Sequence, residues 1–231
     1  MKSPAIKVAV IAVFAAMQAL LSYLPFTITI GMSGQITLGV VGGPLIGILL
    51  GPSIGGSAVL IGSLIGVFLN PGGALFGPFT VIPPTLGAFS AGCVRIKRGY
   101  VAGLAILTSL LVFYAHPSGR EAFAYTWLHI VALVLAFTPL ALLAGSTFES
   151  SKKERTVFGI SMAAFIGVLT DHIVGSAVAI WYFSPVLTPG IWFAAMPIYP
   201  IERLVAFTLA TIITIPVYYG LRRAGFIELL K

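Results

Sequence analysis

Apolar positions dominate this chain and recur in runs that are separated by short polar stretches. About 20 apolar residues cross a bilayer as a helix, and charged residues, Pro and Gly mark the ends of such runs. The sequence therefore predicts eight helical segments, at residues 4–24, 36–51, 53–69, 79–95, 100–115, 126–146, 157–182 and 197–221. The second and third meet at Gly51 and Pro52 and are two steep half-spans, a re-entrant pair or one kinked helix. We expect an all-α fold, a polytopic transmembrane helix bundle of six to eight spans.

The composition excludes a water-soluble fold. Hydrophobic residues make up 58% of the 231 residues and charged residues only 8%, against roughly a quarter in an average soluble domain. No polar stretch is long enough to form a soluble module, so we expect a single integral membrane domain over residues 1–231. The first run follows Lys2 and Lys7, as in a signal peptide, but it lacks a small-x-small cleavage site, which favours a retained helix.

Basic residues fall in small clusters between the apolar runs. The formal net charge is +7, with 13 Lys and Arg residues. If the amino terminus is inside and the number of spans is even, all of them except Arg120 and Arg203 lie on one side. Because cytoplasmic loops carry an excess of Lys and Arg, we expect a multi-pass protein of the cell membrane with both termini in the cytoplasm. Nucleic acid is the less favoured explanation of the charge, and we expect no such partner.

A faint internal repeat relates the two halves of the chain. Residues 54–59 read Ile-Gly-Gly-Ser-Ala-Val, and residues 173–178, at an offset of 119, read Ile-Val-Gly-Ser-Ala-Val. An offset of four spans preserves helix direction, so residues 1–98 and 99–223 would be parallel repeats related by an axis along the membrane normal. Chance agreement among small and apolar residues is the alternative.

Small residues line one face of the first segment. Ala5, Ala9, Ala12, Ala16 and Ala19 are spaced by three or four residues, so they form one stripe on a helix. Side chains of this size let two helices approach closely in lipid. The stripe is therefore either a contact within the chain or an interface with another subunit. For the glycines of the second and third segments, close packing within the chain is the interpretation that we favour.

The first hundred residues resemble the substrate-binding S components of energy-coupling-factor vitamin transporters. The resemblance is carried by the alanine stripe, by Gly42-Gly43-Pro44 with Gly47 and Gly51-Pro52, and by the Pro/Gly/Phe-rich loop from Asn70 to Phe79. It implies a membrane subunit that captures a small molecule and works with a membrane coupling subunit and cytoplasmic ATPases. It also implies that Ala12 and Ala16, together with Ala5 and Ala9, face the coupling subunit. The family usually has six helices, whereas this chain has eight candidate segments.

Ionisable residues inside apolar segments are costly, and they mark candidate functional sites. Asp171 and His172 lie in the middle of the seventh segment, and Glu202 and Arg203 lie at the start of the last. A structural ion pair with Arg203 is the alternative to direct contact with a ligand. Aromatic residues that gather near the same end can stack on a flat ligand. The expected ligand-binding residues are Asn70, Phe79, Asp171, His172, Trp181, Tyr199, Glu202 and Arg203.

The absence of a phosphate-binding loop and of a His-Glu-x-x-His motif narrows the range of functions that we expect. The chain contains no Gly-x-x-x-x-Gly-Lys-Ser/Thr loop, so any dependence on ATP must come from a partner. It contains no His-Glu-x-x-His motif, and we expect no catalytic residues, no cofactor and no metal site. The leading hypothesis is a vitamin-like uptake subunit. The alternatives are a self-sufficient proton-coupled transporter that uses Asp171 and Glu202, and a structural subunit of a membrane complex.

Overall fold

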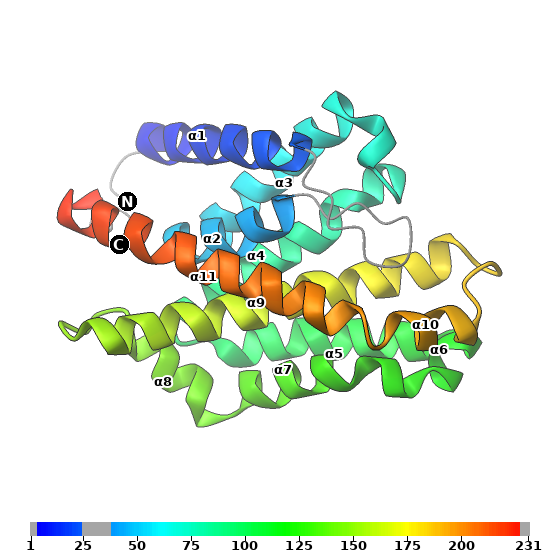
Figure 1. Ribbon diagram of the computed structural model, residues 1–231. Coiled ribbons are helices and arrows are strands. Elements are labelled where there is room, and N and C mark those ends of the chain that lie inside the picture. The colour runs from blue at the N-terminus through cyan, green and yellow to red at the C-terminus, as the bar shows by residue number, and fades with distance from the viewer. Residues whose placement is uncertain (1–3, 25–37, 227–231) are drawn as a thin grey trace.

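The computed structural model describes residues 4–24 and 38–226, and within these ranges the secondary structure is entirely helical (Figure 1). The expected all-α fold is confirmed. The longer helices are α1 (Pro4–Tyr23), α2 (Gly39–Leu50), α3 (Pro52–Leu69), α4 (Ile82–Arg95), α5 (Gly99–Ala115), α7 (Trp127–Phe137), α8 (Pro139–Thr147), α9 (Lys153–Tyr182) and α11 (Tyr199–Arg223). The short ones are η1 (Pro71–Gly73), η2 (Gly77–Val81), α6 (Pro117–Glu121), η3 (Phe123–Thr126) and α10 (Pro189–Ala195).

Each of the eight predicted segments contains a helix, and proline and glycine set the boundaries. Gly51 has a φ of 80°, a left-handed conformation that glycine adopts without strain, and it ends α2 just before Pro52 begins α3. The second and third segments are therefore two separate helices rather than one kinked helix. Pro139 divides the sixth segment into α7 and α8, and the two parts are bent by 69°.

Four described helices are long and apolar enough to cross a membrane on their own: α1, α3, α9 and α11. The bent pair that ends with α8 makes five if it is one span. The 12 residues of α2 extend only about 18 Å, against roughly 30 Å of hydrocarbon. Nearly every residue of α2 is buried inside the bundle, so its hydrophobicity is that of a core helix. By length the described helices thus provide fewer spans than the six to eight expected.

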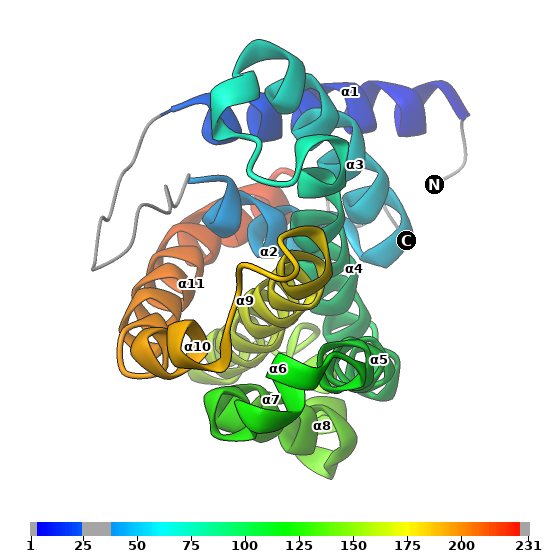
Figure 2. The same ribbon diagram turned by 90° about the vertical axis from the view of Figure 1, so that its right-hand side faces the viewer.

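The long helix α9 forms the centre of the bundle. It packs against α2, α4, α5, α7, α8 and α11, which surround it in the view along the molecule (Figure 2). Helix α1 packs on α3 at the side of this group. Residues 54–59 lie in α3 and residues 173–178 lie in α9, so both copies of the proposed repeat are helical, and the repeat stays a prediction.

Glycines let the central helices touch through their backbones, as predicted for the second and third segments. A Cβ on Gly47 of α2 would overlap the backbone of Ala88 in α4. A Cβ on Gly87 of α4 would lie 2.9 Å from the Cβ of Asp171 and from the carbonyl oxygen of Gly167, both in α9. Close backbone approach is a usual way to pack helices in membranes. Here it also fixes the position of a charged residue.

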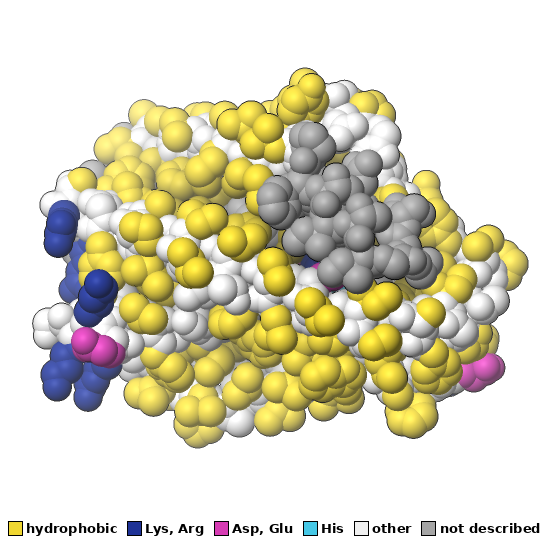
Figure 3. All heavy atoms as spheres, viewed as in Figure 1, with side chains coloured by type: hydrophobic (Ala, Val, Ile, Leu, Met, Phe, Trp, Pro, Cys, Tyr) yellow, Lys and Arg dark blue, Asp and Glu magenta, His cyan; other side chains and the backbone are white. Residues whose placement is uncertain are grey.

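The surface of the described part of the chain is consistent with a multi-pass membrane protein. Its visible face is largely hydrophobic, and Lys and Arg side chains gather at the end where α1 begins and α11 ends (Figures 1 and 3). The turns at this end are tied together. Lys97 lies 3.7 Å from Glu149, and the Arg222 guanidinium donates to the carbonyl of Ser150 at 3.0 Å. Three of the predicted basic clusters therefore share one end of the molecule.

Candidate functional site

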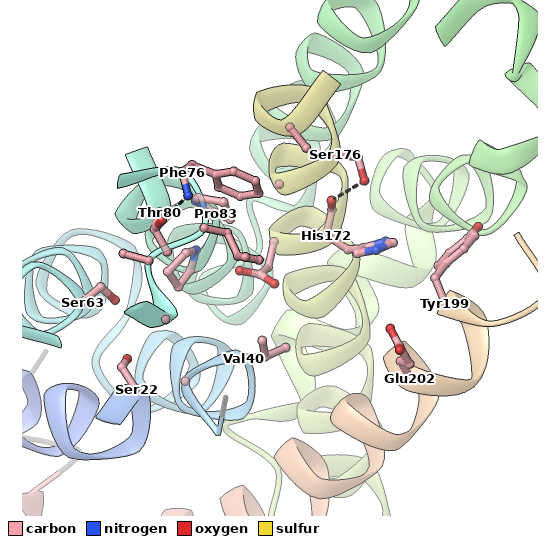
Figure 4. A pocket seen from close by; sticks show the side chains of 18 of the residues that line it. Ser22, Val40, Ser63, Phe76, Thr80, Pro83, His172, Ser176, Tyr199 and Glu202 are labelled. Atoms are coloured by element: carbon pink, nitrogen blue, oxygen red, sulfur yellow. Dashed lines mark hydrogen bonds between the residues drawn. The ribbon is translucent and has the colours of Figure 1, made fainter. Parts of the chain in front are cut away.

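A cavity of about 380 Å³ lies within the bundle and is lined from both halves of the chain. Helices α1, α2, α3 and α4 contribute to it, as do the loop after α3, α9, α10 and the start of α11. Ser22 and Ser63 lie on one side of the cavity, and His172, Tyr199 and Glu202 lie on the other (Figure 4). The cavity thus has two walls of different chemistry, which we name the charged wall (α9 and α11) and the neutral wall (α1 and α3).

The charged wall holds a buried guanidinium between two carboxylates. Arg203 on α11 and Asp171 on α9 are each only 6% exposed. One guanidinium nitrogen lies 3.5 Å from a carboxylate oxygen of Asp171, and another lies 3.8 Å from Glu202. The sequence left open which carboxylate Arg203 neutralises, and the structure places both beside it. A buried charge is tolerated when it is paired, so this arrangement has a structural role whether or not it binds a ligand.

His172 belongs to a group of stacked rings beside the charged residues. Its ring lies 4.8 Å from that of Tyr199 and 5.0 Å from that of His129, with interplanar angles of 25° and 18°. A hydrogen bond of 2.9 Å joins His129 Nε2 to His172 Nδ1. On its other side, His172 Nε2 lies 3.4 Å from the hydroxyl of Tyr125. Asp171 and His172, adjacent in sequence, therefore have different partners.

Tyr125 connects this group to Trp192 of α10, which also lines the cavity. Its hydroxyl lies 2.9 Å from that of Ser176, one turn after His172 on α9. Its carbonyl accepts a 2.7 Å hydrogen bond from the Tyr199 hydroxyl. The indole of Trp192 on α10 packs edge-on against the Tyr125 ring at 4.9 Å. Tyr125, Tyr199 and Trp192 all line the cavity and present aromatic surface to it.

The neutral wall centres on Gln18, an amide that is completely buried in α1. Its nitrogen donates to the hydroxyls of Ser22 at 3.3 Å and Ser63 at 3.4 Å, and to the carbonyl of Gly39 at 3.3 Å. Gln18 and Ser63 are not among the predicted site residues, because that prediction rested mainly on charged side chains. The signal in the sequence is a single amide in a largely apolar helix.

Three polar atoms of lining residues have no hydrogen-bond partner among the described residues: Gln18 Oε1, Trp192 Nε1 and Arg203 Nε. Burying such a group without a partner costs about 1–3 kcal/mol. Unsatisfied buried groups in a native structure therefore call for an explanation, and a bound molecule or water is one. Two of these atoms, Trp192 Nε1 and Arg203 Nε, are donors, and Gln18 Oε1 is an acceptor.

Six of the eight expected ligand-binding residues line the cavity: Asn70, Asp171, His172, Tyr199, Glu202 and Arg203. The structure places Phe79 and Trp181 outside the lining. Phe79 is 54% exposed and meets the edge of the Tyr182 ring. Trp181 is 51% exposed and donates to the carbonyl of Val112 at 3.0 Å. It follows His172 by nine residues, which puts it on the opposite face of α9, since each helical residue turns by about 100°.

The alanine stripe divides into an exposed part and a buried part. Ala5, Ala9, Ala12 and Ala16 are exposed, whereas Ala19 is buried. The packing of α1 on α3 instead uses Ala15, Gln18 and Ala19, with Gly62 of α3 against the Ala15 backbone. The explanation of the stripe as internal packing therefore fails for the four alanines that we assigned to a partner.

Comparison with known proteins gives one relative to report, the uncharacterized protein MJ0923 of Methanocaldococcus jannaschii. It is 33% identical over 148 residues, which cover 64% of this chain and 49% of that protein. The chain thus spans about half the length of its relative. No protein-family model matches the chain, and no solved structure is similar to it.

Proposed function

We propose that this protein is a membrane-embedded subunit that binds a vitamin-like small molecule for uptake. The observation that carries the proposal is the cavity between the charged and neutral walls. Its volume of about 380 Å³ falls in the range of roughly 300–1,000 Å³ that is usual for small-molecule sites. Its lining combines aromatic surface with a few buried polar groups, some without partners. Such a lining orients a ligand through those polar groups and fills the remaining space with apolar contacts.

The exposed alanines support a second part of the proposal, a membrane coupling subunit that docks on α1. One face of α1 presents Ala12 and Ala16 outwards, and another presents Gln18 and Ser22 to the cavity. A helix bound by a partner on one face therefore forms a cavity wall with the other. Because the sequence has no phosphate-binding loop of the Gly-x-x-x-x-Gly-Lys type, cytoplasmic ATPases associated with the coupling subunit would supply the energy.

The orientation that we propose puts the basic end of the molecule in the cytoplasm, together with both termini. α10 and the start of α11, which contribute to the cavity, lie away from that end (Figures 1 and 3). The site would then open to the outside, as capture requires. Single cysteines at Lys152 and Arg223, with Cys93 replaced by alanine, should react only with reagents applied from the cytoplasm. Labelling of either one in intact cells from outside would reverse the orientation.

Identification of the co-purifying molecule tests the proposed function most directly. The protein would be extracted in mild detergent, denatured, and its released small molecules measured by mass spectrometry. We expect one compound near one equivalent per chain, and a clear reduction in Glu202→Gln, which keeps the shape of the side chain. Purification with only lipid and detergent in the cavity would contradict the proposal and favour a structural subunit of a membrane complex.

The docking surface is tested by enlarging the stripe. Ala12→Leu with Ala16→Leu should hold a neighbouring helix away by the width of a side chain and prevent assembly with the coupling subunit. Ala194→Leu changes another exposed alanine, on α10, and should leave assembly intact. The measurement is co-purification of partner proteins from the native membrane. Because these alanines are exposed, ligand content should stay normal, and its loss would mean that the stripe serves the fold.

One observation favours a second candidate, a proton-coupled secondary transporter. Hydrogen bonds connect Ser176, Tyr125, His172 and His129, beside the carboxylates of Asp171 and Glu202. Such chains are typical of proton pathways in transporters. Purified protein alone in liposomes would separate the candidates. Uptake that a pH gradient drives without ATP or partner proteins would favour the proton-coupled transporter. Uptake that begins only when ATP and the partner proteins are added would favour the uptake subunit.

A further inference from the structure

The charges of the cavity do not balance. Asp171, Glu202 and Arg203 are the charged side chains among its described lining residues. Residues 25–37, which the structure does not describe, contain no charged residue in the sequence. Two carboxylates thus share one guanidinium. With both carboxylates ionised the site has a formal charge of −1, and of the two Glu202 has the longer contact with Arg203, 3.8 Å against 3.5 Å for Asp171.

His172 does not supply the missing positive charge. The partners of its ring nitrogens are His129 and Tyr125, and neither is a carboxylate. A neutral imidazole has one donor and one acceptor nitrogen and satisfies both contacts. A protonated ring would add an unpaired cation beside the Arg203 guanidinium in a buried site, which is unfavourable.

We propose that the ligand of this cavity is an organic monocation with a flat ring; this inference rests on the proposed function and specifies its ligand. An anion would meet two carboxylates, and the two terminal nitrogens of the Arg203 guanidinium already face Asp171 and Glu202. A cation instead supplies the second positive charge. If Glu202 is protonated in the empty site, binding of the cation releases that proton to solvent, and the charge balance at the end is the same.

The rings that line the cavity fit the same ligand. Tyr125, Tyr199 and Trp192 surround the charged wall with aromatic surface. Ring faces attract cations, most strongly where water is excluded. Across the cavity, Gln18 and Ser22 provide an amide and a hydroxyl for a polar substituent at the far end of the ring. The cation would therefore lie towards Glu202 and the substituent towards α1.

Three probes that share one ring test the inference: 1-methylnicotinamide, a cation; nicotinamide, which is neutral; and nicotinate, an anion. Binding to the purified protein is measured by calorimetry and by thermal shift. We expect 1-methylnicotinamide to bind at least about tenfold more tightly than nicotinate, with nicotinamide between them. Glu202→Gln should weaken the cation about tenfold and change nicotinamide less than about twofold. Glu121→Gln, which removes an exposed carboxylate of α6, should change neither.

The outcomes separate this inference from the proposed function. Equal or tighter binding of nicotinate would overturn the inference while leaving a small-molecule site in place. If no probe binds, the charge of the co-purifying compound decides, and a neutral or anionic compound would overturn the inference. A cationic ring compound would support it. Absence of both probe binding and a co-purifying compound would overturn the proposed function as well.

Discussion

The two walls of the cavity solve the problem of polar groups inside a membrane protein in different ways. The charged wall gathers Asp171, Glu202 and Arg203 within contact distances of 3.5 and 3.8 Å, beside stacked rings. The neutral wall uses one buried amide, Gln18, that shares its donor nitrogen among two hydroxyls and a carbonyl. The first wall spans α9 and α11, whose residues Asp171 and Arg203 are 32 positions apart in the sequence, and the second joins α1 to α3 and to the start of α2.

The difference indicates how strongly each wall constrains a ligand. Ions in a medium of low dielectric interact strongly, so the charged wall penalises a ligand of the wrong charge. Neutral hydrogen bonds contribute only about 0.5–1.5 kcal/mol net each, so the neutral wall adjusts orientation. Substitutions in the charged wall should likewise lower the free energy of unfolding more than substitutions in the neutral wall, because an unpaired buried ion costs more than an unpaired amide. Three sets of substitutions test this contrast between the walls.

The largest effect is expected from Arg203→Met, which leaves the carboxylates of Asp171 and Glu202 without their positive partner. Loss of one partner from a buried ion pair costs about 3–5 kcal/mol, and the free energy of unfolding in detergent should fall by that amount. Adding Asp171→Asn and Glu202→Gln to the same chain should restore most of it. Arg120→Met, at an exposed arginine of α6, is the control and should be close to neutral. Wild-type stability of Arg203→Met would show that the three charges are not coupled.

An intermediate effect is expected where the backbone supports the charged wall. Gly87→Ala would put a Cβ 2.9 Å from that of Asp171, so α4 and α9 must separate slightly. Overpacking of this kind costs about 1–3 kcal/mol, measurable as a loss of unfolding free energy. Gly220 of α11 has no neighbouring atom within 4 Å of an added Cβ. Gly220→Ala should therefore be neutral or stabilising by up to about 1 kcal/mol, and equal losses in both variants would refute this account.

The smallest effects are expected on ligand affinity, when one residue of each wall is changed in turn. Asp171→Asn should weaken 1-methylnicotinamide about tenfold, which corresponds to about 1.4 kcal/mol, because one charge of the site is lost. Gln18→Leu removes neutral hydrogen bonds and should weaken the same probe only a few-fold. Calorimetry of the two variants beside the wild type measures the ratio. A larger loss in Gln18→Leu would mean that the neutral wall, and not the charged wall, dominates recognition.

The contrast between α2 and α3 shows what the pattern of apolar residues predicts and what it leaves open. Apolar runs predicted a helix in each of the eight segments, because the cost of an unpaired backbone in an apolar environment forces such runs to become helical. Their length alone did not distinguish α2, a short core helix, from a span such as α3. Both look equally apolar in sequence, and only the packing around them shows which one is enclosed by protein.

The all-α class, the helix boundary at Gly51 and Pro52, and the charged residues of the site could be predicted from the sequence alone, whereas the break at Pro139 inside the segment 126–146 was seen only in the structure. These features follow from local chemistry, namely the conformational freedom of glycine, the missing backbone N–H of proline and the cost of burying a charge. The tertiary structure decided which residues share the cavity. It brought Gln18 of α1 opposite Glu202 of α11 and turned Trp181 to the surface. Such contacts depend on the relative rotation of packed helices, which is set by side chains distant in the sequence.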